Sequence, residues 1–183
     1  FEKITNTEGL DLNTITAIGK DGRGRIWLGL DGGLINVYDP ASQTVSRIDD
    51  FRGFQINAFL AQSDSMFVGL NVGVSLYLIN RREVKETYKS LGSLPVQTAV
   101  KNLFIRGREL WVATASGIAK TSLDLANLSA PQSWTNYYTA HGLPSVNVRA
   151  FAAHAGEFYA GTANGVAKWT GTTWINITGN IGS

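Results

Sequence analysis

The chain has 183 residues, of which 44% are hydrophobic and 16% are charged. This length is ordinarily one domain with a substantial core, and the composition does not suit a disordered chain. The net charge of +2 without a basic run does not predict a nucleic-acid partner, and the absence of cysteine excludes disulfides, thiolate metal sites and thiol nucleophiles. No apolar run approaches the roughly 18 to 20 residues of a membrane span, so we expect no membrane insertion.

The first ten residues, FEKITNTEGL, predict a short strand at 1–5 and then a turn. The same pattern returns at 134–143 as WTNYYTAHGL, and it begins a third time at 174–178. One copy of this strand is therefore surplus. Because the chain also starts with Phe1 rather than methionine, we expect 1–5 to be the outer strand of a preceding repeat, in a piece of a longer protein. A closed ring of the repeats in this chain is the alternative.

The stretch 21–38, DGRGRIWLGLDGGLINVY, contains a turn, a short strand, a second turn at 31–33 and another strand. Three degraded copies follow. Their aromatic anchors Trp27, Phe67, Trp111 and Tyr159 are 40, 44 and 48 residues apart. A period of about 40 to 50 residues indicates a propeller or another repeat array.

Each repeat gains an inner strand before this unit, predicted at 13–18, 55–59, 100–103 and 147–151. Each also gains an outer strand after it, at 44–48, 84–88, 134–138 and 174–178. Four short strands joined by Gly, Asp, Asn or Ser turns predict an all-β fold, a β-propeller of four-stranded antiparallel blades. We place about four blades, at 12–50, 51–94, 95–143 and 144–178, within a larger propeller. The only helix candidate is 123–128.

The inner strands are apolar on both faces, so one repeat cannot cover its own surface and neighbouring blades must do so. We therefore expect the aromatic anchors to pack between blades. Two positions after each anchor stands a small residue, where close approach of the next blade leaves little room. These small residues are Gly29, Gly69, Ala113 and Gly161.

On these residues the sequence resembles the two-component regulator propeller repeat. The family pattern of Asp-x-x-Gly-x-Ile/Leu-Trp-x-Gly-Thr, Gly-Gly-Leu and Gly-Leu-Pro is carried by Asp21, Gly24, Ile26, Trp27, Gly29, Gly32, Gly33 and Leu34, and by Gly142, Leu143 and Pro144. Leu30 replaces the family's threonine, the second repeat lacks the first-turn glycine and the tryptophan, and the third has Ala113 for glycine. The resemblance covers nearly the whole chain, but its motifs are structural.

The resemblance implies an extracytoplasmic bacterial propeller, often the sensory part of a hybrid histidine kinase that recognises oligosaccharides. We therefore expect a non-catalytic ligand-recognition or sensor propeller, periplasmic or secreted, whose partners are a glycan or another small ligand and a protein partner or the missing blades. Similar repeats occur in secreted and secretion-associated proteins without a kinase. A structural or protein-interaction propeller is accordingly the alternative.

We predict no catalytic residues, no metal site and no cofactor. His141 stands before Gly-Leu-Pro at the place that Glu8 holds in the first copy, and His154 follows an inner strand. Two scattered histidines favour surface roles and argue against a lyase. The turn at 21–24 lacks the alternating oxygen ligands of a calcium loop, so a hairpin turn is the better interpretation.

One set of polar residues suggests a ligand site. Thr16, Asn57, Lys101 and Arg149 occupy matching places in the four inner strands. If these strands line a central channel, Asn57, Lys101 and Arg149 contribute to a ligand-facing surface, together with the nearby loop residues Asp31, Asn71, Gln97 and Asn164. In the alternative interpretation the same groups make hydrogen bonds between blades or meet channel water.

Overall fold

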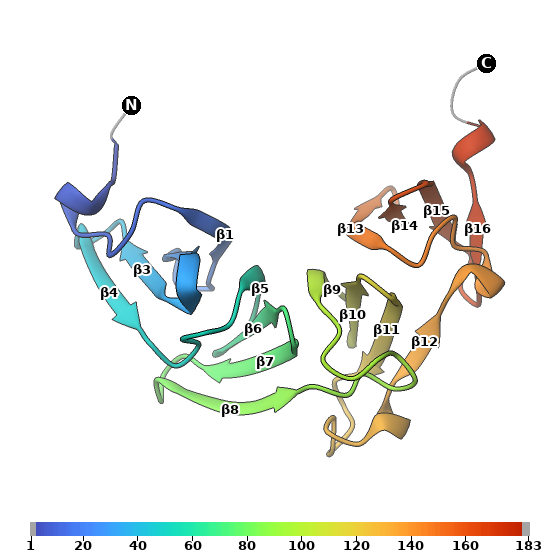
Figure 1. The fold of residues 1–183 in the computed structure, drawn as a ribbon, viewed down its shortest axis with the longest axis horizontal. Helices are drawn as coiled ribbons and strands as arrows, with labels where there is room; N and C mark the ends of the chain where they lie inside the picture. The colour runs from blue at the N-terminus through green and yellow to red at the C-terminus, as the bar shows by residue number, and fades with distance from the viewer. Residues whose placement is uncertain (1–2, 181–183) are drawn as a thin grey trace. The chain divides into compact units, whose positions relative to one another are not determined.

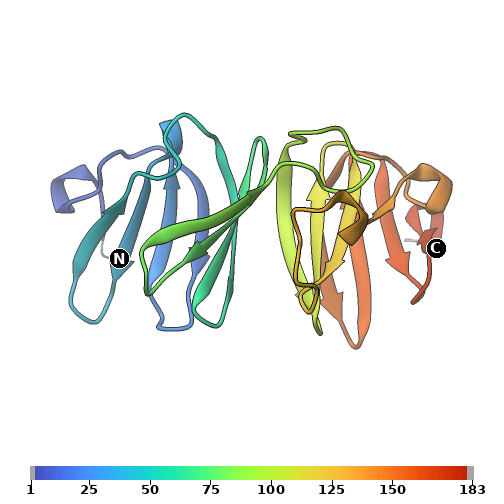
Figure 2. The same ribbon diagram turned by 90° about the horizontal axis from the view of Figure 1, so that it is seen from below.

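The computed structural model describes residues 3–180, and the chain divides into two compact units, Phe1–Thr87 and Tyr88–Ser183. Each unit is built from two four-stranded antiparallel sheets in which consecutive strands are neighbours (Figure 1). In Figure 2 the strands of each unit run mostly up and down, with the turns gathered at the two ends of the sheets. The predicted all-β fold of four-stranded antiparallel blades is confirmed.

The first unit contains two sheets. The first sheet is β1 (Ile15–Lys20), β2 (Ile26–Leu30), β3 (Ile35–Asp39) and β4 (Thr44–Ile48). The second is β5 (Ile56–Gln62), β6 (Ser65–Leu70), β7 (Gly73–Leu78) and β8 (Glu83–Tyr88), whose last residue lies across the division between the units. Two short 3-10 helices, η1 (Asn6–Glu8) and η2 (Asp31–Gly33), complete the unit.

The second unit also contains two four-stranded sheets. The third sheet is β9 (Val100–Arg106), β10 (Glu109–Thr114), β11 (Gly117–Ser122) and β12 (Thr135–Tyr137), and the fourth is β13 (Val148–His154), β14 (Glu157–Thr162), β15 (Gly165–Trp169) and β16 (Trp174–Asn176). The 3-10 helices are η3 (Pro131–Ser133), η4 (Thr139–His141) and η5 (Thr178–Asn180). The hairpin turn predicted at 21–24 also has its observed counterpart, since it joins β1 to β2.

Two local predictions differ from the structure. The helix candidate at 123–128 consists of turns and irregular backbone, because its few leucines are set among Asp and Asn, which favour turns. Of the strand predicted at 1–5, Lys3–Thr5 have no strand structure, and Phe1 and Glu2 lie outside the described residues. A strand needs a pairing partner for its backbone groups, and within residues 3–180 each sheet pairs only its own four strands, so the assignment of 1–5 to a preceding blade stays a prediction.

The likeness between the stretches at 1–10 and 134–143 is real at the level of local structure. Thr5 and Glu8 form a capping box around η1. At η4 the backbone N–H of Tyr138 donates to Nδ1 of His141 at 3.0 Å, which is the half of the box that Glu8 supplies at η1. His141 therefore takes the place of Glu8, as predicted from the repeat.

The core of the first unit lies between its two sheets. Trp27 on β2 is buried and meets Phe59 and Tyr77 of the second sheet edge to face, with ring centroids 6.0 and 5.7 Å apart. A Cβ added to Gly29 would lie 2.8 Å from Cγ2 of Ile56 on β5. Both the interlocking aromatic anchor and the small residue beside it are thus as predicted for this repeat.

The core of the second unit is richer in aromatic rings. Trp111 on β10 is fully buried and contacts Phe158, Trp169 and Trp174 of the fourth sheet, with centroids 5.0 to 5.8 Å apart. Tyr137 of β12 stacks on the same indole at 5.9 Å. Since a pair of aromatic rings contributes about 0.5–1.5 kcal/mol beyond the area that it buries, this cluster holds the third and fourth sheets together.

Candidate functional site

All four polar residues singled out in the inner strands lie at a β-bulge. In the first sheet Ile15 faces Leu30 while Ala17 faces Gly29, so Thr16 has no partner of its own. The ladder register shifts in the same way at Asn57, Lys101 and Arg149. A bulge turns a side chain out of the regular alternation and is frequent beside functional sites. We call the end of each sheet that carries this bulge the bulge end.

The turns between the second and third strands lie at the same end. In the first unit the N–H of Asp31 donates to the Thr14 carbonyl at 3.3 Å, and Asn71 exchanges two 3.0 Å hydrogen bonds with the backbone of Gln55. The bulge ends of this unit therefore hold Thr16, Asn57, Asp31 and Asn71. The Asn71 side chain is used within its own sheet, and Oγ1 of Thr16 is buried without a hydrogen-bond partner among the described residues.

The bulge ends of the second unit hold Gln97, Lys101, Arg149 and Asn164. Nζ of Lys101 donates to Oδ1 of Asn147 at 2.7 Å, which joins the third sheet to the residue before the fourth. This contact is one that the alternative interpretation, hydrogen bonding between blades, predicts. Arg149, Gln97 and Asn164 are exposed.

Sequence reasoning missed a hollow at the outer edge of the same bulge end in the third sheet. It is a shallow, open depression of about 540 Å³ beside the end of β12 and the loop that leads into β9, lined by Ser93, Trp134, Asn136, Tyr138 and His141. The antiparallel register places the end of β12 and the start of β9 at the same end of the sheet. The signal available in the sequence was the change from Thr5 and Glu8 in the first copy to Tyr138 and His141 in the second.

Hydrogen bonds fix the orientation of the groups in this hollow. Asn136 donates to the Leu91 carbonyl at 2.9 Å, and its Oδ1 accepts from both the N–H and the hydroxyl of Ser93, at 2.7 and 3.0 Å. Because the Ser93 hydroxyl has a single hydrogen, Tyr138 must be the donor in the 2.8 Å contact between the two hydroxyls. The Tyr138 oxygen therefore keeps its acceptor capacity.

His141 adds a donor to the same hollow. Its Nδ1 accepts the Tyr138 N–H, so in the neutral imidazole the proton is on Nε2. The ring lies at 5.9 Å from that of Tyr138. The hollow thus offers an N–H donor, hydroxyl acceptors and aromatic rings within one short stretch of surface.

The other histidine lies elsewhere. His154 is exposed and ends β13, whose start carries the bulge, so the two histidines are at opposite ends of the second unit. Within residues 3–180, no three His, Cys, Asp or Glu side chains gather in a way that could hold a metal ion. No helix in the described part of the chain has the length and apolar character to span a membrane.

No protein-family profile matches the chain, and no curated protein matches it in sequence. Solved structures do match. The extracellular domain of BT3049 of B. thetaiotaomicron, assigned to the hybrid two-component systems, is 23% identical with a TM-score of 0.72, over 92% of this chain and 23% of that one. The extracellular domain of BT4673 from the same organism, assigned as a one-component system, gives 17%, 0.71, 92% and 22%.

A third similar structure has another role. PorZ, a surface component of the type-IX secretion system of Porphyromonas gingivalis, is 15% identical with a TM-score of 0.73, over 95% of this chain and 23% of that one. The chain therefore spans 22–23% of the length of these three structures. The similarities show that the chain has a β-propeller fold, and at the level of the fold they confirm the resemblance carried by the repeat.

Proposed function

We propose that this chain is a ligand-recognition part of an extracytoplasmic sensor, without catalysis, and that it binds an oligosaccharide at the bulge ends of its sheets. The lining of the hollow at Tyr138 and His141 is the observation that carries the proposal. The location and the sensory role are supported by the extracellular domains of two-component and one-component systems that share the fold.

The hollow suits a sugar because a hydroxyl group both donates and accepts hydrogen bonds. Nε2 of His141 would donate to one hydroxyl, and the oxygens of Tyr138 and Ser93 would accept from its neighbours. Trp134 and Tyr138 offer apolar ring surface for the C–H face of a pyranose. Gln97 and Lys101 lie on or just after the same loop as Ser93, so a longer ligand would extend toward the bulge.

The two histidines support a role without catalysis. General acid–base chemistry needs groups that reach the same substrate atoms, and His141 and His154 lie at opposite ends of the second unit. The Nδ1 atom of His141 is already used in the cap of η4.

The test is a thermal-shift screen of neutral oligosaccharides, followed by titration. A ligand that binds only the folded chain stabilises it by about 2.7 kcal/mol at a hundred times its Kd. We expect His141→Ala to weaken the binding of a hit roughly fivefold, the equivalent of one lost hydrogen bond, and His154→Ala, the matched control, to leave it unchanged. Equal effects of the two substitutions would refute the assignment of the hollow.

The predicted bulge residues are tested with the same ligand. Lys101→Ala and Arg149→Ala should weaken binding at unchanged stability if they face the ligand. Lower stability at unchanged affinity would instead support the alternative for Lys101, a hydrogen bond between blades.

A second candidate function is a structural or protein-interaction propeller in a secretion-associated protein. PorZ, which is described as a surface component of a secretion system, favours it. In that case no oligosaccharide in the screen raises the melting temperature, and the chain captures a protein partner in its place.

A further inference from the structure

The first unit has a hollow that the proposed function does not use. It lies between the first and second sheets, encloses about 240 Å³, and is lined by three arginines, Arg23, Arg25 and Arg82, with Asn80 and the rings of Trp27 and Tyr77. Arg23 lies within the β1–β2 turn and Arg25 directly precedes β2, while Asn80 and Arg82 belong to the β7–β8 turn. Both turns lie at the ends of their sheets opposite the bulges.

One of the three arginines is balanced by a buried carboxylate. Asp21 has a side chain 1% exposed, and its Oδ2 accepts from Nε of Arg25 at 2.8 Å and from Nε1 of Trp27 at 3.0 Å. Its Oδ1 accepts the backbone N–H groups of Arg23 and Arg25. Burial works to raise the pKa of Asp21, but these hydrogen bonds outweigh it and hold the pKa below its ordinary value. Asp21 therefore holds the charged guanidinium of Arg25 in place. Both carboxylate oxygens of Asp21 already accept hydrogen bonds.

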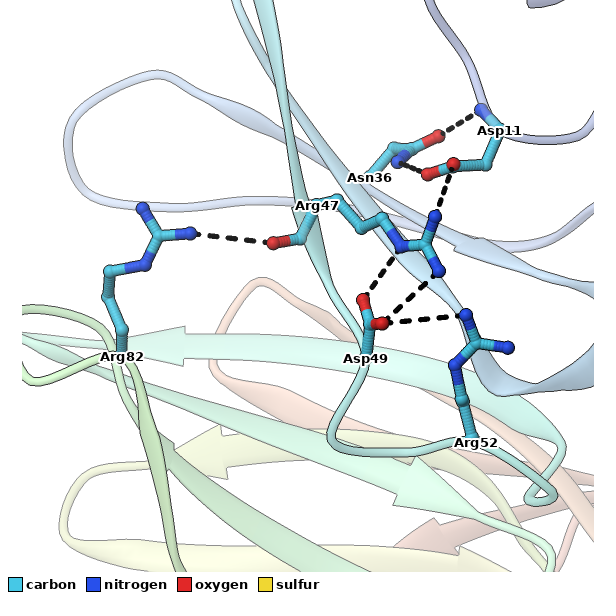
Figure 3. A network of polar contacts seen from close by, with 6 residues as sticks. All are labelled: Asp11, Asn36, Arg47, Asp49, Arg52 and Arg82. Carbon is cyan, nitrogen blue, oxygen red and sulfur yellow. Dashed lines mark hydrogen bonds and ion pairs between the residues drawn. The ribbon is translucent and has the colours of Figure 1, made fainter.

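The acidic residues near Arg82 form ion pairs with other arginines. Figure 3 shows Arg47 between Asp11 and Asp49, at 3.0 and 2.7 Å, with Arg52 also reaching Asp49 at 3.4 Å. Hydrogen bonds to Arg47 lower the pKa of Asp49. The negative charges of Asp11 and Asp49 are therefore neutralised by Arg47 and Arg52. Nη2 of Arg82 meets only the neutral backbone carbonyl of Arg47 in this network, at 3.4 Å.

Arg23 is also held mainly by a neutral group. Its guanidinium donates to the amide oxygen of Asn80, which leaves the Asn80 N–H groups as further donors. Asp64 lies 3.7 Å away, but both side chains of that pair are about half exposed, at 57% and 47%, so water and salt screen it. Asp50 is close enough for its charge to act on Tyr77. Burial, and then Asp50, raise the pKa of Tyr77, so its hydroxyl remains a donor.

We propose that this hollow binds an anionic oxygen group, a carboxylate or a sulfate, between Arg23 and Arg82, with Asn80 completing the set of donors. Guanidinium groups match such oxyanions in geometry, since their N–H groups are arranged as a planar fork. The volume of the hollow suits a free oxyanion or one acidic sugar residue. The site is independent of the oligosaccharide site proposed above, because it belongs to the other unit and to the opposite end of the sheets.

The test uses sodium sulfate and sodium glucuronate as probes, titrated into the chain at constant ionic strength with sodium chloride as the balance. NMR spectra of the arginine Nε–H groups report which arginines respond. We expect saturable shifts for Arg23 and Arg82. We expect Arg82→Gln to weaken binding roughly tenfold, the lower end of a charge-assisted hydrogen bond, while Arg81→Gln changes it little. Arg81 is the matched control, since this neighbouring arginine does not line the hollow and pairs with Glu83 at 3.6 Å.

Each outcome of this titration either supports or overturns the proposed anion site. Saturation by either anion with the expected difference between the two variants supports the proposal, and the anion that binds identifies the group that the hollow takes. Equal losses in Arg82→Gln and Arg81→Gln would mean general surface charge and would overturn it, as would shifts that chloride reproduces at the same ionic strength. Arg23→Gln is a second variant for the same comparison if Arg82→Gln lowers the melting temperature.

Discussion

The substitution Gly29→Ala tests how closely the first and second sheets pack. The new Cβ would lie 2.8 Å from Cγ2 of Ile56, 3.1 Å from its Cβ and 3.2 Å from Oγ1 of Thr16, whereas ordinary contacts begin at 3.4 Å. The closest contact is thus too short by 0.6 Å (3.4 − 2.8). Ile56 is fully buried, so it has no open space to move into. Overpacking of this kind costs about 1–3 kcal/mol of unfolding free energy.

Gly161 provides the matched control. It holds the same place in the fourth repeat, but a Cβ there would meet only the Ala150 carbonyl oxygen at 3.8 Å. Gly161→Ala should therefore be neutral, or should stabilise the chain by about 0.4–1 kcal/mol by restricting the unfolded state.

Urea denaturation followed by circular dichroism measures both variants. Gly29→Ala should also lower the melting temperature by about 2–4 °C for each kcal/mol. In an Ile56→Ala background the added methyl group should cost less, since the 2.8 Å contact with Cγ2 is removed and only the contacts with the Cβ of residue 56 at 3.1 Å and with Oγ1 of Thr16 at 3.2 Å remain. An equal cost of Gly29→Ala in both backgrounds would refute the reasoning, as would equal effects at Gly29 and Gly161.

Three further predictions follow from single contacts. Gly142→Ala should strongly lower the unfolding free energy of the second unit, because its Cβ would lie 1.8 Å from the Trp174 carbonyl oxygen. Gly171 has a similarly positive φ but open space around it, so Gly171→Ala should cost only about 1 kcal/mol in the same thermal melts. The pKa of Asp21 is lower in the folded chain than its ordinary value of 3.8, so its contribution to stability is complete above pH 3.8 and is lost as the pH falls through the folded pKa. The urea midpoints at pH 7 and pH 3 should therefore differ less in Asp21→Asn than in the wild type. Asn136→Ala should release Ser93 and cost about 1–3 kcal/mol, with faster amide exchange at Ser93.

The repeat made most of the fold predictable. An aromatic anchor and a small residue two positions after it recur in all four repeats, with turns around them, so the strand order and the blade design could be predicted from the sequence. The boundaries were less accurate. The inner strands continue to Lys20, Gln62, Arg106 and His154, past the predicted ends at 18, 59, 103 and 151, because each stays paired with the second strand up to the hairpin turn.

The candidate sites were likewise predicted only in part. Alignment of the repeats found Asn57, Lys101 and Arg149, which the structure places at bulges, although no sequence pattern predicts a bulge there. The hydrogen bond from Lys101 to Asn147 was foreseen only as the alternative interpretation. The two hollows were not predicted, since each joins residues from turns far apart in the chain, such as Ser93 with Tyr138 and Arg23 with Arg82.

The amino-acid pattern alone specifies the blade, because alternating apolar residues, turn-forming glycines and one aromatic anchor per repeat recur within about 40 residues. Which polar side chains meet depends on the folded arrangement of the strands and loops. Whether Arg82 faces a carboxylate or a backbone carbonyl, and whether the proton of His141 is on Nε2, depends on groups supplied by other strands and loops. Such hydrogen bonds depend on ångström-scale distances between elements, which no periodicity in the chain specifies.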